Sequence, residues 1–591
     1  MKKKYWILFL CLYLLSSAAV LKFVPAGARW NIFIIIMMLG IVLALMLLMF
    51  TLKPIDIKDK QAGHGQHGRS HIMGADEEKE TFCFVPNGNE TEPGFVIDYK
   101  NSEWEVDASE DNILLLAPPK AGKTTRIFIT SIFYNAFVNI NTKGKGASMI
   151  ILDCKGELFR QCAGMLQKAG YKTPALDLRN ILHSSRYNFI VNVNRAIDEY
   201  KAAADDLQRA ITYGKAERYA KVAASQLIDN SGADVKSEAS DYFNETARGL
   251  LTGIILLVSE YGAKDERHII SVFNLILEMN GQIQGQQNAN QTQKTKLQEL
   301  LEYIDNRRIM NYTGAATSAD MRTSMNVFSS ALGKLTKFID AELEQLLCDH
   351  DEEFDSRAFI EQPTAMFFIS PDENTTRHFM SSLCVRNTLN DTIEIAELDY
   401  GGKLPRKVQL YLDEFGQQPP IQDYDALSAA YRSRGGRFII AIQDFAQLHK
   451  HYSKDKADII KGTNQTLITS FVAPSALQTA ETLSKIMGNE TILTGSNTKS
   501  YGKISSSTSL VGRPLMSPSE LITMPLGDFI VIKGGHNPLR IQPPGYWTFL
   551  TPLPEPTKPP LHYKKIAVAS ADSIRKRNGE HSYQLTHGMF D

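Results

Sequence analysis

The chain has 591 residues, of which 43% are apolar and 22% are charged, the composition of an ordinary globular protein. This length exceeds what one hydrophobic core can organise, so we expect two or three domains in addition to any membrane part. A net charge of −1 excludes the overall basic excess of a nucleic-acid coat protein, so any contact with DNA must come from a local surface. The six cysteines form no CxxC pair, which favours reduced thiols over a disulfide framework or a zinc site.

Two uncharged apolar runs open the chain, 17 residues at 5–21 and 23 residues at 30–52. Each is long enough to cross a bilayer as a helix. Lysines flank both outer ends, so residues 1–53 are predicted to form a transmembrane hairpin with both ends in the cytoplasm. A cleaved signal peptide is the alternative, because Ala26-Gly27-Ala28 resembles a cleavage site. The second run would anchor the chain under either interpretation.

The rest of the chain is predicted to have an α/β fold with a helical insertion. Residues 54–80 are polar and charged, and are predicted to form a linker. From about 194 to 348 only helical periodicity occurs, which indicates an all-helical domain inserted between two strands. The α/β domain then comprises 81–193 and 349–552, and a proline-rich, polar tail follows at 553–591, either wrapped on the surface or loose. Seven short apolar runs are predicted to be buried parallel strands, namely Asn112–Leu116, Ser148–Leu152, Ala365–Ile369, Val408–Leu412, Arg437–Ile442, Leu467–Val472 and Phe529–Ile532.

The first of these strands leads into a loop that is suited to bind phosphate. An amphipathic helix follows the loop, and this order of strand, loop and helix is the context that a phosphate-binding loop (P-loop) requires. Small residues let successive backbone N–H groups face one anion. Lys123 is predicted to reach the β- and γ-phosphates of ATP, and the Thr124 hydroxyl to bind Mg²⁺. The predicted nucleotide-binding residues are Ala117, Pro118, Pro119, Lys120, Ala121, Gly122, Lys123, Thr124 and Thr125.

The loop departs from the usual pattern at its start. Ala117 stands in place of the first glycine, and Pro118 and Pro119 have no N–H group to donate. The donors from Lys120 to Thr124 remain, and they are the ones nearest to the phosphates in this kind of loop.

A pair of acids lies at the end of another predicted strand, where Val408–Leu412 is followed directly by Asp413 and Glu414. A carboxylate at the tip of a buried strand is where a P-loop enzyme holds Mg²⁺, so Asp413 is the predicted metal ligand. Glu414 is predicted to polarise the attacking water as a general base. A strand end capped by solvated acids is the alternative.

Three further polar residues are candidates for catalysis. Gln443 follows the next predicted strand, where a glutamine can sense the γ-phosphate or the attacking water. Arg434, or Arg432 in its place, precedes that strand and is a candidate to stabilise transition-state charge in a neighbouring subunit. A solvated turn is the alternative for both arginines.

These residues resemble the coupling proteins of type IV secretion and conjugation, a branch of the RecA-like hexameric translocases. The similarity extends from the two N-terminal runs to about Trp547, and it is specific because short motifs keep their order around the two nucleotide motifs. The motifs are Gln66-His67-Gly68-Arg69, Asp153-Cys154-Lys155-Gly156-Glu157, Ser185-Arg186-Tyr187-Asn188, Asp241-Tyr242-Phe243, and Thr479-Ala480 with Ser484 and Gly488.

The resemblance implies a RecA-like P-loop NTPase domain with an inserted all-helical domain, preceded by two transmembrane helices. It implies a homo-hexameric ring on the bacterial inner membrane. It also implies an ATPase that recruits relaxase-bound single-stranded DNA, or a protein substrate, and drives it into a type IV secretion channel. ATP and Mg²⁺ are the expected cofactors, and single-stranded DNA, the relaxase and the channel components are the expected partners.

Other functions remain open at this point. The chain could be a membrane-bound adaptor for secretion substrates in which the nucleotide acts only as a switch. Hydrolysis stimulated by single-stranded DNA would distinguish a motor from such an adaptor. A cell-division DNA translocase fits less well, because those proteins usually carry more spans and a winged-helix tail.

Overall fold

The computed structural model of the chain describes residues 65–229, 238–280, 295–319, 321–371, 375–500 and 503–587, with Gly27 and a few positions between 30 and 42. Among these residues there is no helix of the length and apolar character needed to cross a bilayer. The two predicted spans, 5–21 and 30–52, lie for the most part outside the described residues. By its contacts the chain divides into two units, Met1–Arg69 with Asn489–Arg513 and Ser70–Gly488 with Pro514–Asp591.

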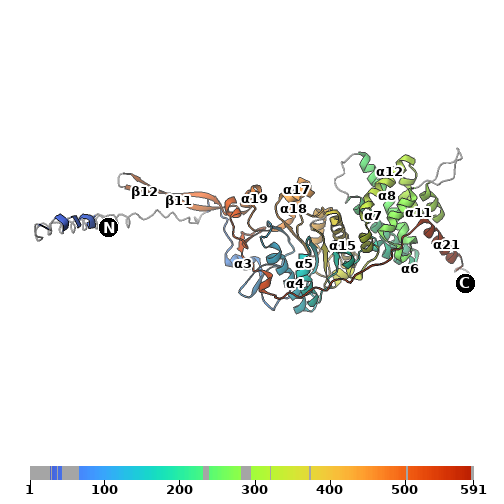
Figure 1. Cartoon of the computed structure of the whole chain (residues 1–591), viewed down its shortest axis with the longest axis horizontal. Coiled ribbons are helices and arrows are strands. Elements are labelled where there is room, and N and C mark those ends of the chain that lie inside the picture. The colour runs from blue at the N-terminus through green and yellow to red at the C-terminus, as the bar shows by residue number, and fades with distance from the viewer. Residues whose placement is uncertain are drawn as a thin grey trace. The chain divides into compact units, whose positions relative to one another are not determined.

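The larger unit is built on a sheet of nine strands in the order β14-β13-β10-β4-β9-β8-β5-β7-β6. Figure 1 shows strands of this region among the helices that pack on them. Every residue of β4, β5, β7, β8 and β9 is buried, as expected for strands that helices cover on both faces. Side chains alternate between two cores, with Leu114 and Leu116 on one face and Ile113 and Leu115 on the other. The strands are β4 (Asn112–Leu116), β5 (Ser148–Asp153), β6 (Ala175–Asp177), β7 (Ala365–Ile369), β8 (Val408–Leu412), β9 (Gly436–Ile442), β10 (Asn464–Thr469), β13 (Phe529–Lys533) and β14 (Leu539–Ile541).

All seven predicted strands are present, but the predicted direction of one of them is wrong. β13 pairs antiparallel with β10, with Leu467 opposite Ile532, whereas the other six pair with one another in parallel. The apolar pattern of a buried strand is the same in both directions, so the sequence does not reveal this reversal. The pattern also misses β6 and β14, which have only three residues each.

A second, antiparallel sheet of three strands precedes β4 in the chain. Its strands are β1 (Cys83–Pro86), β2 (Phe95–Lys100) and β3 (Glu103–Asp107), in the order β1-β3-β2. The sequence pattern misses this sheet because the carboxylates of Asp98 and Glu105 occupy buried, mutually opposite positions. The Lys100 ammonium lies 3.1 Å from Asp98 and 3.6 Å from Glu105, which offsets part of the cost of burying their charge.

Helices cover both faces of the nine-stranded sheet. The π-helix η1 (Lys123–Phe128) continues into α4 (Ile129–Thr142), and together with α5 (Glu157–Lys168) they pack on the face that carries Ile113. On the other face pack α15 (His378–Asp399) and α16 (Tyr424–Arg432). The other helices of this region are α3 (Ala75–Thr81), which falls within the predicted linker, α17 (Ala446–His451), α18 (Lys454–Thr463), α19 (Leu477–Met487) and α20 (Pro518–Ile522).

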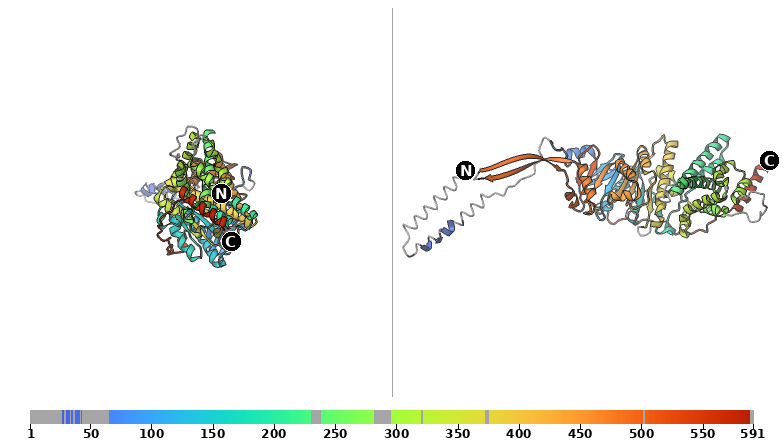
Figure 2. Two further views of the ribbon diagram at one scale, coloured as in Figure 1. Left: turned by 90° about the vertical axis from the view of Figure 1, so that its right-hand side faces the viewer. Right: turned by 90° about the horizontal axis from the view of Figure 1, so that it is seen from above.

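Between β6 and β7 the described residues form helices and no named strand, and most of these helices gather into one bundle (Figure 2). The bundle is centred on α8, which packs against α7, α9, α11 and α12. The buried residues of α8 include Leu250, Leu251, Ile254 and Val258, whose spacing places them on one side of the helix. The helices are α6 (Val191–Ala202), α7 (Asp206–Asp229), α8 (Glu238–Tyr261), α9 (Ile269–Met279), α10 (Lys296–Ile304), α11 (Arg307–Thr317), α12 (Met321–Leu335), α13 (Ala341–Leu347) and α14 (Ser356–Glu361).

The smaller unit contains a long β-hairpin that the sequence pattern does not predict. Strands β11 (Asn489–Ser500) and β12 (Lys503–Pro514) pair with each other, and Glu490 of β11 also forms an antiparallel bridge with Arg69. At the base of the hairpin, the Thr491 hydroxyl accepts a hydrogen bond from the His67 N–H at 3.0 Å and donates one to the Gly68 carbonyl at 2.9 Å. The motif Gln66-His67-Gly68-Arg69 is therefore joined to this hairpin.

The predicted tail begins with an extended segment, which we call the C-terminal strap, residues 553–570. Side chains of the body hold its main chain. The Gln167 amide donates to the Thr557 carbonyl at 3.1 Å and accepts from the Thr557 N–H at 2.9 Å. Gln345 makes the same pair of bonds with Lys564, at 3.0 and 2.8 Å. The strap thus connects α5 to the helical bundle, where it continues into α21 (Ala571–His587).

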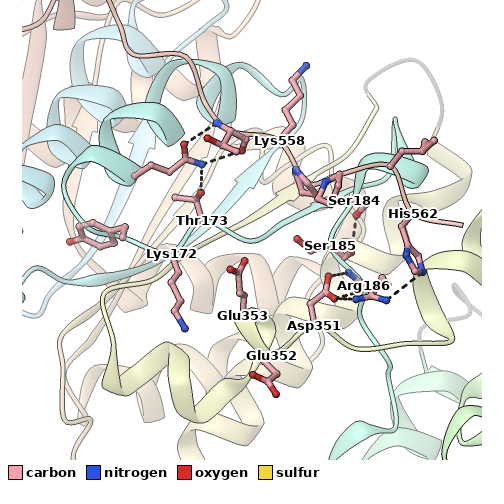
Figure 3. A pocket seen from close by; sticks show the side chains of 16 residues that line it. Lys172, Thr173, Ser184, Ser185, Arg186, Asp351, Glu352, Glu353, Lys558 and His562 are labelled. Atoms are coloured by element: carbon pink, nitrogen blue, oxygen red, sulfur yellow. Dashed lines mark hydrogen bonds and ion pairs between the residues drawn. The ribbon is translucent and has the colours of Figure 1, made fainter. Parts of the chain in front are cut away.

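A cavity of about 700 Å³ lies beside the strap (Figure 3). In this view the Arg186 guanidinium faces Asp351 and His562, which the structure places 2.8 Å and 3.4 Å from its nitrogens. Lys172 and Glu353 belong to the same lining. Because the lining carries both signs of charge, it favours no single class of ligand.

The paired glutamines generate a prediction for the strap. Gln345→Ala removes both bonds to Lys564, so the Lys564 amide should exchange its hydrogen about tenfold faster, while the Thr557 amide keeps its protection. Gln167→Ala should have the converse effect, so each variant is the control for the other. Hydrogen-exchange mass spectrometry on the full chain measures both sites. Unchanged exchange in both variants would mean that the glutamines do not hold the strap.

Candidate nucleotide-binding and hydrolysis site

The backbone of the loop after β4 forms a tight turn that leads into a helix. The Ala117 N–H donates to the Ile442 carbonyl at 3.0 Å, which extends the pairing of β4 with β9 by one residue. Lys120 and Gly122 then adopt left-handed backbone conformations, with φ of 65° and 96°. Helix η1 starts at Lys123, and the N–H groups of a first helical turn have no partner within the helix. The loop and the helix N-terminus therefore form a candidate anion-binding site.

The unusual start of the loop leaves these donors in place. Ala117 and Pro118 are buried, and the Pro118 carbonyl accepts from the Ala121 N–H at 3.3 Å. The tight turn comes from Lys120 and Gly122, downstream of the prolines. The missing first glycine and the missing proline N–H groups therefore do not affect the part of the loop that faces an anion.

Lys123 joins this loop to the end of β8. Its ammonium lies 2.7 Å from Glu414 Oε1 and 3.2 Å from Asp413 Oδ1, and all three side chains are largely buried. Burial opposes the charged form of the lysine, but the Asp413 and Glu414 carboxylates raise the pKa of Lys123 above its ordinary value. The lysine is therefore fully charged at neutral pH, as required for a group that binds phosphate.

The residues predicted to bind Mg²⁺ face each other. The Thr124 hydroxyl donates to Asp413 Oδ2 at 3.4 Å, and a hydroxyl and a carboxylate are oxygen ligands of the kind that Mg²⁺ takes. In the part of the chain that the structure describes, no cluster of three or more histidine, cysteine, aspartate or glutamate side chains could hold a metal ion.

Glu414 is fixed by three donors. Besides Lys123 on Oε1, the amide of Gln443 donates to Oε2 at 2.7 Å and the amide of Gln417 at 2.8 Å. The Glu414 backbone is left-handed, with φ of 51°, which marks local strain of a kind that concentrates at functional sites. The sequence indicates Gln443 but not Gln417, whose position three residues after Glu414 in a loop gives no recognisable signal.

The motif residue Asp153 has a positioning role at the end of β5. Its buried carboxylate accepts from the N–H groups of Lys155, Glu157 and Phe159 at 2.9–3.2 Å, so it caps the N-terminus of α5. Burial raises the pKa of Asp153 to about 6, against the lowering effect of these hydrogen bonds. The next residue, Cys154, donates its S–H to the Asp413 carbonyl at 3.3 Å. This strand end therefore supports the acidic pair.

The two candidate arginines are not brought to the loop within one chain. β9 runs from Gly436 toward Ile442 beside the loop, so Arg432 and Arg434, which precede β9, lie at the opposite edge of the sheet. Arg434 forms an ion pair with Glu397, and its Nη1 donates to a main-chain carbonyl at 2.7 Å. Arg432 is exposed.

The other motif residues serve the fold around the site. Ser185 Oγ accepts from the Ala175 N–H at 3.2 Å and so caps the edge strand β6. The Tyr187 hydroxyl accepts from the Asn387 amide at 2.7 Å. Thr479 donates to Asp444 at 3.2 Å, just beyond Gln443. These motifs link neighbouring elements to the sheet without contacting the loop.

A phosphate-binding loop, its lysine and an acidic pair on one edge of a largely parallel sheet define a P-loop NTPase. Residues 79–571 match the family described as Type IV secretory system Conjugative DNA transfer. This match covers most of the chain, and the protein belongs to that family.

Curated relatives agree with this assignment. The conjugal transfer protein TraG of Escherichia coli is 23% identical over 477 residues, which cover 74% of this chain and 67% of TraG. The protein VirD4 of Agrobacterium fabrum is 22% identical over 463 residues, which cover 75% of this chain and 60% of VirD4.

Solved structures share the fold. The unbound bacterial conjugative coupling protein TrwBdeltaN70 matches with a TM-score of 0.52 and 14% identity, covering 82% of this chain and 96% of its own. The plasmid coupling protein TrwB in complex with ADP and Mg²⁺ matches with a TM-score of 0.51 and 13% identity, covering 88% and 98%. The similarity in fold covers nearly the whole length of each of these two solved chains.

The loop geometry predicts the effect of a single methyl group. A Cβ at Gly122 would lie 2.8 Å from Arg126 Cδ, at a φ of +96° that side chains rarely adopt. Gly122→Ala should therefore weaken the binding of a fluorescent ATP analogue by at least about tenfold. Gly144→Ala is the matched control, because its φ of +118° imposes similar backbone strain in open space, away from the loop. Parental affinity in Gly122→Ala would refute the assignment of the phosphate site.

Proposed function

We propose that this chain is a coupling ATPase anchored in the inner membrane. It recruits relaxase-bound single-stranded DNA, or a protein substrate, and drives it into a type IV secretion channel during conjugative transfer. Membership of the conjugative DNA transfer family supports the process. The proposal of hydrolysis rests on the contact of Lys123 with Glu414. This contact places a phosphate-binding group 2.7 Å from a candidate general base.

ATP fits the chemistry of the loop. The backbone donors of the loop and the Lys123 ammonium bind the β- and γ-phosphates. Thr124 and Asp413 would hold Mg²⁺, which neutralises charge that develops on the phosphate oxygens. The TrwB structures in complex with ADP and Mg²⁺, and with a non-hydrolysable ATP analogue, support these two ligands for this chain.

The contacts of Glu414 suggest how binding prepares catalysis. A γ-phosphate competes with Glu414 for the Lys123 ammonium, so binding of ATP frees Glu414 Oε1. Gln443 and Gln417 still hold Oε2, at 2.7 and 2.8 Å, and keep the carboxylate oriented. Oε1 can then accept a proton from the attacking water. The same lysine thus restrains the base when no phosphate competes and releases it when substrate binds.

Assembly completes the proposal. Residues 1–53 are proposed to anchor the chain as a transmembrane hairpin, with residues 194–348 as a helical domain inserted into the ATPase domain. The proposed active form is a homo-hexameric ring. Because Arg432 and Arg434 lie at the edge of the sheet opposite to the loop of their own chain, any contact they make with a γ-phosphate is proposed to be with that of a neighbouring subunit.

Substitution of Glu414 tests hydrolysis. Glu414→Gln should leave ATP affinity within about threefold and lower the hydrolysis rate by about 10²–10⁴-fold, because it removes the base and keeps the phosphate contacts. Lys123→Ala should lose nucleotide binding, and Glu481→Gln, at an exposed acid, is the control. The rates are measured on the full chain with and without single-stranded DNA. Turnover by Glu414→Gln at the parental rate would exclude this role.

Substitution of the arginines tests assembly. Replacing Arg432 and Arg434 together by alanine should keep ATP affinity within a few-fold and lower DNA-stimulated hydrolysis by about 10³–10⁵-fold. Glu397→Gln is the control, because it breaks the same ion pair and keeps both arginines. Mixing the double variant with Lys123→Ala should restore some hydrolysis. A silent mixture of two proteins that demonstrably co-assemble would contradict a trans-acting arginine at these positions.

A further inference from the structure

Arg126 extends from the phosphate-binding loop toward the strands on the far side of β4. It lies three residues after Lys123, and its Cδ passes so close to Gly122 that a Cβ there would be 2.8 Å away. Its guanidinium ends beside Gly527, where a Cβ would lie 3.3 Å from Cζ. Its Nη1 donates to the Pro543 carbonyl at 2.7 Å. The two glycines and this carbonyl hold the guanidinium in one place.

An exposed tryptophan lies beside this guanidinium. Trp547 belongs to the short 3₁₀ turn Tyr546–Thr548 after β14, and its ring centroid is 5.9 Å from Arg126 Cζ. Half of Trp547 is exposed, whereas the neighbouring Tyr546 is partly buried against the core of α4. The exposed part of this aromatic ring, beside a fixed cation, is available to a flat ligand.

Because of the strand order, the two ends of the nucleotide site lie beside different strands. Asp413 and Glu414 follow β8, which lies two places from β4 on one side. Arg126 points to the other side, where β10, β13 and β14 follow one another. With its γ-phosphate toward Glu414, a nucleotide on the loop directs its nucleoside to this second side. The Arg126–Trp547 pair is therefore at the end of the site where a base would lie.

We propose that Arg126 and Trp547 form the base subsite of the nucleotide whose phosphates the loop binds. This inference rests on the proposed function, that the loop binds ATP. The exposed half of the indole ring, beside the Arg126 guanidinium, is a surface on which a purine stacks. Trp547 then makes the site prefer nucleoside phosphates to bare polyphosphate. Arg126 holds the base beside the loop at Gly122.

A subsite that binds by stacking does not distinguish one base from another of similar size. Every base has a π-face, so a stacking contact reads flatness and size and not the pattern of donors and acceptors on the base edge. One guanidinium N–H group of Arg126 is already bonded to Pro543. The subsite should therefore accept ATP and GTP with affinities within about threefold of each other.

The test compares ligands with and without a base on the full chain in detergent. Binding of ATP, GTP and inorganic tripolyphosphate is measured by titration calorimetry. Trp547→Ala should lower the affinities for ATP and GTP by about tenfold, as expected for one lost stacking contact. The affinity for tripolyphosphate should stay within about twofold of the parental value. Trp547→Phe should recover most of the loss, because it restores an aromatic face. Tyr563→Ala, which removes an aromatic ring that is 79% exposed on the strap, is the matched control.

The outcomes separate this inference from the proposed function. An equal loss of all three ligands in Trp547→Ala would mean that the tryptophan only supports the fold, and an unchanged ATP affinity would remove it from the site; either result overturns the base subsite. A loss for ATP but not for GTP would overturn stacking as the mode of binding. Lys123→Ala should abolish binding of all three ligands. If Lys123→Ala binds ATP normally, the proposed function fails as well.

Discussion

The buried ion pair of Lys123 with Asp413 and Glu414 is the contact on which the rest of the α/β region depends. Lys123 and Glu414 are separated by 291 positions in the chain, and each would be costly to bury without the other. Parallel pairing of β4, β9 and β8 brings the carboxyl ends of these strands to one edge of the sheet. Gln443, at the end of the middle strand, then reaches Glu414 from between its two neighbours.

The sequence predicts this part of the molecule well because local patterns suffice. Each buried strand appears as a short apolar run. Asp413, Glu414 and Gln443 directly follow the strands that position them, and Lys123 lies beyond the loop that follows β4. The meeting of Lys123 with Asp413 and Glu414, and of Gln443 with Glu414, then follows from the general rule that carboxyl ends of parallel strands share an edge. Arg432 and Arg434 precede their strand, and for the same reason they lie at the opposite edge.

What the sequence does not reveal depends on contacts between distant or irregular segments. The direction of β13 leaves no trace in its apolar pattern, and the buried charges of Asp98 and Glu105 mask the three-stranded sheet. The role of Gln417 depends on a strained loop, and the place of Arg126 depends on a carbonyl more than 400 residues later. Such features combine several weak local choices, so single-sequence patterns cannot identify them.

Gln167 and Gln345 hold the strap by its main chain, so the path of the strap depends little on its own side chains. Both glutamines hold the strap by its main-chain atoms, while the side chains of Leu561 and Tyr563 are 65% and 79% exposed. Substitution of these two exposed side chains leaves the main-chain bonds intact, whereas proline at 557, 562 or 564 removes an N–H that donates to the body. The course of the strap over the body therefore depends little on which side chains occupy its exposed positions.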